Sequence, residues 1–487
     1  MDAVMFHRTL SCCLLVLSLL PLSVMASGFS RLSSLTDDGF RISAEARLLG
    51  TGDRADETLA SLSPTLSLSP ASVSKVYTAA AALDRFGPQH RFTTRLVGTA
   101  EPGPDGMLAG DLVLDGGGDP ALTSEDLWRL VQRLHQAGVR EVTGQLIVSQ
   151  WRFGPVECIT TDRCEARRQV DNAYSALLSS AGINFGNWCV HVAPGSAPGA
   201  SAVVTGCDSK VLLPGIDNRV DTKAADSGTQ LSALRLTEGG GDVMRLSGQI
   251  STNAHPRDLY RASADPADQT AQLLMAMLER AGIQVRGGYS TSTVQPPGSA
   301  PQLAAVDGKP LQEILLRTLN YSNNFMADVL ALDMANGPRP SLEQGGAAIE
   351  AFAAGIPGHG PLTLRSGSGL TPENRTTASG VNSLLAYMFD QPSLFPSFVA
   401  ALQSPSNGVM RFIRKGPASF QQRVMIKTGT LNEPVRVRAM TGYFRTRSNR
   451  WGAFTVLVNG TESTPYLNWT MVLERLSEDL AQLIESH

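Results

Sequence analysis

A serine and a lysine three residues apart, Ser72 and Lys75, carry the first candidate chemistry of this sequence. On an α-helix, positions i and i+3 share a face, so the hydroxyl and the amine can meet. A lysine beside a serine can take its proton and convert the hydroxyl into a nucleophile for acyl transfer. Ser-x-x-Lys is a short pattern that also occurs by chance in ordinary helices. Its weight therefore depends on motifs further along the chain.

A second pair, Ser322 and Asn324, interrupts the helical pattern of residues 311–330. The break predicts a tight turn that would direct both side chains into a cleft. There, the hydroxyl could relay a proton and the amide could hold a peptide carbonyl. As a helix break alone, Ser-Asn-Asn is ordinary.

A third motif, Lys427-Thr428-Gly429-Thr430, continues a strand-like stretch at 423–426. An ammonium beside two threonine hydroxyls suits the terminal carboxylate of a peptide. The glycine gives the strand edge no side chain, which would let a peptide pair against it. Taken alone, Lys-Thr-Gly would favour an ordinary solvated strand end.

A helix has to position the first pair, and its neighbours predict one. Pro70 suits a first helical turn, where no backbone N–H is needed, and Gly87-Pro88 predicts the end. Between them, apolar residues recur at helical spacing, at Val76, Tyr77, Ala80 and Leu83. The serine would then also lie at the positive end of the helix dipole.

In chain order, the motifs are Ser-x-x-Lys at a helix start, Ser-x-Asn in a turn and Lys-Thr-Gly on a strand. The chain thereby resembles the penicillin-recognising serine hydrolases, in which this order and these contexts are fixed. The stretch between Ser72 and Ser322 is longer than compact β-lactamases need, which indicates a large insertion. Most of the mature chain is similar to class C low-molecular-mass penicillin-binding proteins, the D-alanyl-D-alanine carboxypeptidase/endopeptidase family of the PBP4 type, peptidase family S13. Residues 83–92, 116–122 and 366–370 support the resemblance.

The resemblance implies an α/β (α+β) fold, with a β-lactamase/transpeptidase-like serine hydrolase domain interrupted by a β-rich inserted domain. We expect the hydrolase domain to be discontinuous, over residues 27–95 and 261–487, with the insertion at 96–260. The patterns within the insertion and at its end are short strands at 92–118, 141–149, 201–206 and 246–251 and helices at 124–137 and 266–281.

The resemblance also implies a role for each matching residue. Ser72 would be the acylated nucleophile and Lys75 its general base, with Ser322 and Asn324 completing the proton network and positioning the substrate amide. The backbone N–H groups of Ser72 and Thr430 would form the oxyanion hole. The residues implied to hold the terminal carboxylate or line the site are Lys427, Thr428, Gly429, Thr430 and Ser368. No cofactor or metal is implied.

The expected reaction is a two-step acyl transfer on peptidoglycan stem peptides, with D-Ala release or crosslink cleavage, and with β-lactams as inhibitors. A β-lactamase is one alternative, although no clear glutamate motif for fast deacylation is present. An inactive peptidoglycan-binding protein is another, but such a protein has no need of a nucleophile and a base. Oligomeric state is not readable from the sequence.

Two departures from the family stand out. Ser366 occupies a position where the family usually carries Asp, and the effect of this change is not readable from the sequence. The cysteine-containing region around 171–189 matches the family poorly, so substrate contacts from that region do not transfer.

The first 26 residues predict an exported protein. His7 and Arg8 precede an apolar run at 10–24, and small residues follow around Ala26, which is typical of a secretory signal peptide. A retained anchor is the alternative, although the run is short for a membrane span. Asn320-Tyr321-Ser322 is formally a glycosylation acceptor, and a glycan there would block the site, so a bacterial periplasm fits better than a eukaryotic secretory origin.

Composition agrees with a globular protein of two or three domains. Of the 487 residues, 42% are hydrophobic and 17% charged, enough for sizeable cores, and a net charge of −3 gives no reason to invoke nucleic acid.

Four cysteines remain after the signal peptide, at Cys158, Cys164, Cys189 and Cys207. In an exported chain they favour two disulfides, and sequential pairing is our expectation among three connectivities. A zinc site is the alternative, but no C-x-x-C pair or nearby histidine supports it.

Overall fold

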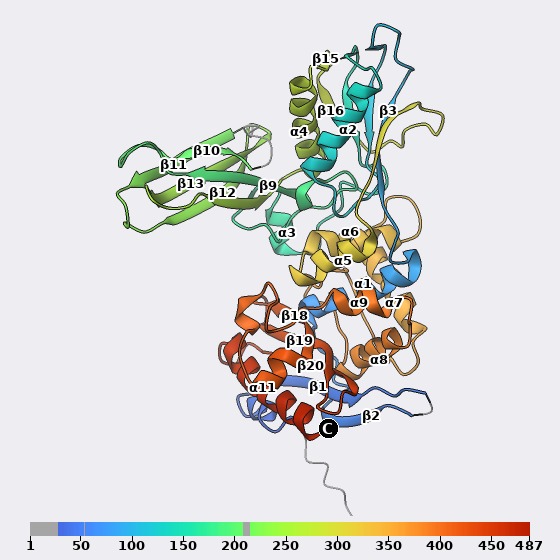
Figure 1. The fold of residues 1–487 in the computed structure, drawn as a ribbon, viewed down its shortest axis with the longest axis vertical. Helices are drawn as coiled ribbons and strands as arrows, with labels where there is room; N and C mark the ends of the chain where they lie inside the picture. The colour runs from blue at the N-terminus through green and yellow to red at the C-terminus, as the bar shows by residue number, and fades with distance from the viewer. Residues whose placement is uncertain (1–27, 53, 208–214) are drawn as a thin grey trace, which may run out of the picture.

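The computed structural model describes residues 28–52, 54–207 and 215–487. The molecule is elongated, with a sheet at one end, a helical layer in the middle and a second group of sheets at the other end (Figure 1). The expected signal peptide lies outside the described residues. In the described part of the chain, no helix is long and apolar enough to cross a membrane.

The lower sheet contains strands from both the N-terminal and the C-terminal parts of the chain. Its five strands are all antiparallel, in the order β18-β19-β20-β1-β2. The strands are β1 (Arg41–Leu48), β2 (Glu57–Leu62), β18 (Val424–Leu431), β19 (Val437–Arg445) and β20 (Trp451–Asn459). In Figure 1 the blue N-terminal pair therefore lies beside the red C-terminal strands. Only the last three fall in the stretch expected to alternate helices and strands. The pair β1–β2 is an addition from the structure.

Helices cover both faces of this sheet, and β19 shows why. Its side chains alternate, so Met440 and Phe444 enter the core beneath α11 (Trp469–Ser486), whereas Ala439 and Tyr443 enter the core on the other face. That second core is shared with the helical layer. The layer contains α1 (Ser74–Phe86), α5 (Leu311–Asn320), α6 (Asn324–Met334), α7 (Leu342–Ala354), α8 (Ala378–Phe389) and α9 (Phe395–Ala400).

The upper sheet has the order β16-β7-β5-β3-β17 and mixes parallel and antiparallel pairs. Its strands are β3 (Thr93–Gly98), β5 (Leu112–Asp115), β7 (Leu146–Ser149), β16 (Tyr289–Ser292) and β17 (Gln302–Asp307). The helices α2 (Ser124–Gln136) and α4 (Pro266–Arg280) share its apolar core. Three short strands complete the top, namely β4 (Met107–Leu108), β6 (Glu141–Val142) and β15 (Gln284–Val285).

Two further sheets project sideways from this upper part (Figure 1). One has the order β10-β9-β14 and the other β11-β13-β12-β8, and they enclose a small apolar core. The strands are β8 (Gln169–Val170), β9 (Asn187–Ala193), β10 (Val203–Gly206), β11 (Gly215–Lys223), β12 (Gln230–Glu238), β13 (Gly241–Ser251) and β14 (Arg257–Ala262).

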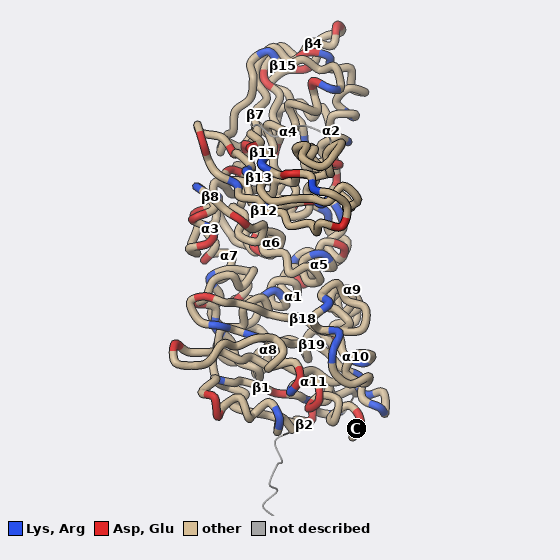
Figure 2. Tube along the Cα trace, turned by 90° about the vertical axis from the view of Figure 1, so that its left-hand side faces the viewer, with Lys and Arg blue, Asp and Glu red and all other residues tan. Residues whose placement is uncertain are grey.

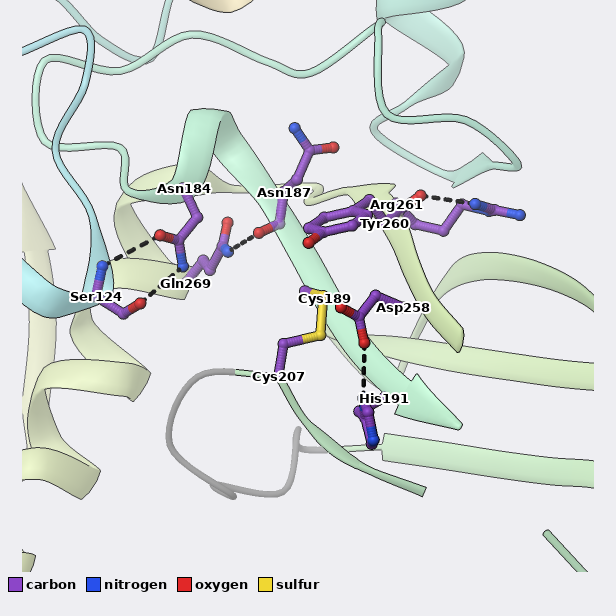
Figure 3. The surroundings of a disulfide bond; sticks show 10 residues. All are labelled: Ser124, Asn184, Asn187, Cys189, His191, Cys207, Asp258, Tyr260, Arg261 and Gln269. Carbon is purple, nitrogen blue, oxygen red and sulfur yellow. Dashed lines mark hydrogen bonds and ion pairs between the residues drawn. A yellow bond between two sulfur atoms is a disulfide. The ribbon is translucent and has the colours of Figure 1, made fainter. Parts of the chain in front are cut away.

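The expected disulfide pairing is confirmed. Cys189 on β9 is bonded to Cys207 just after β10, and Cys158 is bonded to Cys164. Figure 3 shows the first of these bonds, with His191 and Asp258 facing each other across β9 and β14, 2.7 Å between Nδ1 and Oδ1.

The sheet topology favours a longer inserted part than the sequence indicated. A boundary at 260/261 would cut through β14 and separate α4, β16 and β17 from the upper sheet and its core. We therefore propose that the insertion runs from residue 93 to residue 307, between the first and last strands of the upper sheet. In this proposal α4 belongs to the inserted part, although its helical periodicity is the same as that of the helices of the hydrolase domain.

Candidate active site

Ser72 lies in a tight turn directly before the central helix. The turn, η2 (Ala71–Val73), is a 3-10 helix, and α1 begins only at Ser74. The backbone of Ala71, next to Ser72, has a left-handed φ of 46°, which is a strained conformation for a residue other than glycine. The sequence expected Ser72 inside the first α-helical turn. In the structure the serine precedes the helix, but the pair still meets, with 3.0 Å between Lys75 Nζ and Ser72 Oγ.

Lys75 is completely buried, and its amine has three polar neighbours. Nζ donates to Asn324 Oδ1 at 2.7 Å and to the Ser368 carbonyl at 2.6 Å. Both oxygens can only accept. A neutral amine has two hydrogens and one lone pair, so these acceptors leave the lone pair for the Ser72 hydroxyl. Burial, the largest effect, lowers the pKa of Lys75 to about 7, against the opposing charge of Asp328. Lys75 is thus suited to accept a proton near neutral pH.

The turn between α5 and α6 delivers the second pair as the sequence predicted. Ser322 has a left-handed φ of 54°, and the Asn323 side chain caps α6 by accepting the Met326 N–H. This geometry turns Ser322 Oγ to Lys427 Nζ, 2.8 Å away, and Asn324 to Lys75. Ser322 and Asn324, the two residues of this motif, therefore contact the two lysines of the site.

Strand β18 brings the third motif against the serine turn. A side chain at Gly429 would lie 2.5 Å from the Pro70 carbonyl, so glycine is required here for close packing of the strand on the turn. The sequence offered only the approach of a peptide as the reason for this glycine. Lys427 is buried, and its pKa is well below its usual value because of burial and, next, the charge of Lys75.

The two threonines of this motif have different surroundings. Thr430 is exposed, and its Oγ1 accepts a hydrogen bond from Trp469 Nε1 at 2.9 Å. Thr428 is buried, and its hydroxyl donates to Met410 Sδ at 3.3 Å. Of the two hydroxyls, that of Thr430 is the one accessible to a ligand.

Ser368 reaches the site through its backbone. Its carbonyl accepts from Lys75, its N–H donates to Asp328 Oδ1 at 2.8 Å, and its own hydroxyl accepts from the Leu370 N–H. Ser366, which departs from the family pattern, is buried and accepts from the Thr371 hydroxyl.

Sequence reasoning missed several residues that hold the site together. Asp328 lies one helical turn after Asn324, a spacing that could have revealed it. Tyr174 accepts from Asn324 Nδ2 through its backbone carbonyl, at 3.0 Å, and Trp469 contacts Thr430 from α11. These contacts carry no sequence signal, because they depend on how distant segments pack.

The arrangement can support hydrolysis by acyl transfer, with a hydroxyl 3.0 Å from a buried amine and the edge strand β18 beside it. A family model described as the D-Ala-D-Ala carboxypeptidase 3 (S13) family matches residues 48–478. The chain is a hydrolase of the peptidase class. It belongs to the D-Ala-D-Ala carboxypeptidase 3 (S13) family.

Known proteins agree with this family in sequence and in fold. The chain is 29% identical to a D-alanyl-D-alanine carboxypeptidase of Actinomadura sp. (strain R39), over 81% of this chain and 73% of that protein. It is 25% identical to D-alanyl-D-alanine carboxypeptidase DacB of Haemophilus influenzae, over 80% of both. The crystal structure of penicillin binding protein 4 (dacB) from H. influenzae matches with a TM-score of 0.73 and 21% identity, over 92% of this chain and 99% of that one. The expected fold class is thereby confirmed.

Proposed function

We propose that this protein is a serine-type D-Ala-D-Ala carboxypeptidase and DD-endopeptidase that acts on peptidoglycan stem peptides through an acyl-enzyme on Ser72. The observation that carries the proposal is that Ser72 Oγ lies 3.0 Å from the buried Lys75 Nζ, whose other two polar neighbours, Asn324 Oδ1 and the Ser368 carbonyl, can only accept. A purely binding protein would gain nothing from a neutral, buried base at that position.

In the first step, Ser72 Oγ attacks the carbonyl carbon between the two D-Ala residues while its proton passes to Lys75 Nζ. The backbone N–H groups of Ser72 and Thr430 would stabilise the oxyanion. Collapse of the tetrahedral intermediate breaks the C–N bond, and the departing D-Ala amine takes up the proton that Lys75 accepted from Ser72, passed on through the Ser322 hydroxyl. Ser322 suits this relay because it lies against Lys427.

In the second step, a water molecule attacks the ester carbonyl and gives its proton to Lys75. Ser72 then leaves with a proton and the shortened peptide is released. When the leaving amine belongs to a neighbouring stem peptide, the same two steps open a crosslink.

Substrate recognition would fall to the strand edge and its neighbours. Thr430 presents an exposed hydroxyl for the terminal carboxylate. Lys427, on the same strand, donates to Ser322 Oγ and to the Thr428 carbonyl. β-Lactams would occupy the same place and acylate Ser72. One support is that a solved structure of penicillin binding protein 4 from H. influenzae, with a TM-score of 0.69 and 21% identity, is a complex with a β-lactam.

The place of action in this proposal is the periplasm of a bacterium, reached through the signal peptide expected at residues 1–26, with peptidoglycan remodelling as the process. Two disulfides support an oxidising compartment.

The test is intact-mass spectrometry of the mature protein with benzylpenicillin, followed by peptide mapping and an assay of D-Ala release from a D-Ala-D-Ala peptide. We expect one stable adduct on the peptide that contains Ser72, and loss of both adduct and D-Ala release in Ser72→Ala. Ser74→Ala is the matched control, since this buried hydroxyl contacts Asn374 rather than Lys75. Rapid drug turnover without an adduct would indicate a β-lactamase, and neither adduct nor turnover would indicate a binding protein.

A further inference from the structure

An arginine from the inserted part is buried behind the active site. Arg163 lies on α3 (Thr161–Glu165), a short helix tied down by the Cys158–Cys164 disulfide. Its side chain is 2% exposed, and Nη1 lies 2.9 Å from Oδ2 of the fully buried Asp328. Its Nε and Nη2 make no hydrogen bond within the described part of the chain. The ion pair with Asp328 therefore compensates a charge that burial would otherwise penalise strongly.

Asp328 connects this arginine to the base of the site. It lies one turn after Asn324 on α6, and its Oδ1 accepts the Ser368 N–H at 2.8 Å. The Ser368 carbonyl in turn accepts from Lys75 at 2.6 Å. A single residue thus separates the carboxylate from the amine that has to receive the Ser72 proton.

Two charged groups act on Lys75, each from a different element: Asp328 from α6 and Arg163 from α3. Lys427 on β18 also faces Lys75, but burial and the charge of Lys75 lower its own pKa. An uncompensated carboxylate would favour the ammonium form of Lys75, whereas the Arg163 guanidinium opposes it. Accordingly, Asp328 raises and Arg163 lowers the pKa of Lys75, after the larger effect of burial.

We propose that Arg163 is a positioning residue that keeps Lys75 unprotonated by compensating the Asp328 carboxylate, so that the inserted part of the chain sets the protonation state of the base. This rests on the proposed role of Lys75 as the base for Ser72. Without Arg163, the buried carboxylate would hold Lys75 as an ammonium, and Ser72 would have no acceptor for its proton. An acceptor oxygen at position 328 has to stay, because it fixes the Ser368 backbone, and asparagine keeps that acceptor.

The test is the pH dependence of Ser72 acylation by a fluorescent benzylpenicillin derivative, between pH 5.5 and 9.5. For Arg163→Met, we expect the acidic limb of the rate profile to move up by about one pH unit or more, with acylation about tenfold slower at pH 7 and largely recovered at pH 9.5. Arg163→Lys should stay close to the parent protein because it keeps the charge. The double variant Arg163→Met/Asp328→Asn, which removes both charges, should return the limb toward its parental position.

Arg152→Gln is the matched control. It also loses an arginine–aspartate pair with α6, at Asp333, 2.9 Å from Nη2 to Oδ1, but that pair lies at the far end of the helix and should leave the limb unmoved. Equal slowing at every pH in Arg163→Met, with no movement of the limb, would overturn the proposal. Should Arg163→Met fail to fold, as judged by circular dichroism, a limb displaced from the parental position in the double variant, or an altered limb in Arg163→Lys, would overturn it as well. Absence of any Ser72 adduct in the parent protein would instead contradict the proposed function.

Discussion

At the scale of single residues, the site depends on keeping two buried lysines next to one another. The Lys75 amine contacts two acceptor oxygens and the Ser72 hydroxyl. The Lys427 amine contacts Ser322 and the Thr428 carbonyl. Burial of an amine disfavours its charged form, so the fold holds these groups at an energetic cost in return for reactivity.

The first prediction concerns this cost. The pKa of Lys75 is about 7 in the folded protein and ordinary, 10.5, in the unfolded chain. Between these values the unfolded chain binds a proton that the folded protein does not bind, so the free energy of unfolding rises with pH from about 7 to 10.5. The penalty that Lys75 places on folding is therefore full below about pH 7 and disappears above pH 10.5. Lys75→Met should therefore stabilise the protein more at pH 6 than at pH 9, with a difference of about 2 kcal/mol between the two gains.

Urea unfolding at both pH values measures this difference. Thr78→Val, a change of a buried group on the same helix that does not titrate, should shift stability equally at both. An equal effect of Lys75→Met at pH 6 and pH 9 would contradict the low pKa.

The second prediction concerns Trp469. Because its Nε1–H donates to Thr430 Oγ1, the Thr430 hydroxyl keeps its own hydrogen for the substrate carboxylate. Trp469→Phe keeps the packing against Phe412, whose ring centre is 5.1 Å away, and removes only the donor. We expect kcat/KM for a D-Ala-D-Ala peptide to fall about three- to tenfold, mainly through KM. Steady-state kinetics test this, with exposed Trp128→Phe on α2 as the control. An unchanged KM would show that Thr430 needs no such partner.

At the scale of elements, the predictable part of the site was what one element determines by itself. The spacing of Ser72 and Lys75 predicts that both side chains lie on one side of a helix. The break after Asn320 predicts a turn, and the apolar run before Lys427 predicts a strand. The turn and the strand lie where they were expected, and the Ser72–Lys75 pair meets although Ser72 precedes α1, because these features need only local periodicity and turn chemistry.

The part that could not be predicted requires several elements to meet. The Ser368 carbonyl reaches Lys75 because Gly369, with φ +76°, allows its segment to pack on the serine turn, where a side chain would lie 1.9 Å from the Ala71 carbonyl. Arg163 reaches Asp328 from a segment of the inserted part that is far away in the sequence. The end of the inserted part is hard to place from the sequence for a related reason, because the periodicity of α4 is the same whichever domain it packs on.

The third prediction concerns the disulfide next to Arg163. The Cys158–Cys164 bond restrains the loop that holds α3, so its removal should let Arg163 leave Asp328 part of the time. Cys158→Ala/Cys164→Ala should then move the acidic limb of the acylation profile upward, by less than Arg163→Met does. Cys189→Ala/Cys207→Ala removes the other disulfide, which joins β9 to β10, and should leave the limb in place. Equal limbs in both variants would show that α3 holds its arginine without the bond.

At the scale of the whole molecule, the catalytic part and the inserted part are joined where the chain crosses between them. The crossing segments pair at their ends, since the Gly308 N–H donates to the Phe92 carbonyl just outside β17 and β3. Lys and Arg residues and Asp and Glu residues are interspersed along the full length of the molecule (Figure 2). Individual contacts at the crossing, such as the Gly308–Phe92 hydrogen bond, join the two parts.

Asp119 is one of those contacts, and it carries the last prediction. It lies in the glycine-rich turn after β5, accepts the Ala121 N–H at 2.8 Å and packs against Gly308, where a side chain would lie 2.1 Å from its Oδ2. Burial raises its pKa to about 7 from an ordinary 3.8. The folded protein thus keeps a proton that the unfolded chain releases, and the stability from this group is lost as pH rises from 3.8 through about 7.

Asp119→Asn keeps the shape and the acceptor but removes the titration, so it should stabilise the protein by about 2 kcal/mol more at pH 8 than at pH 5. Urea unfolding at the two pH values measures this. Asp105→Asn is the matched control, because this exposed aspartate also accepts one backbone N–H, from Met107. A gain from Asp119→Asn that is the same at both pH values would show that the carboxyl stays ionised at the crossing. The expected pH-dependent gain would instead mean that Asp119 favours the folded contact between the two parts at low pH and disfavours it above neutral pH. Acylation of Ser72, in contrast, becomes faster as pH rises, because Lys75 loses its proton.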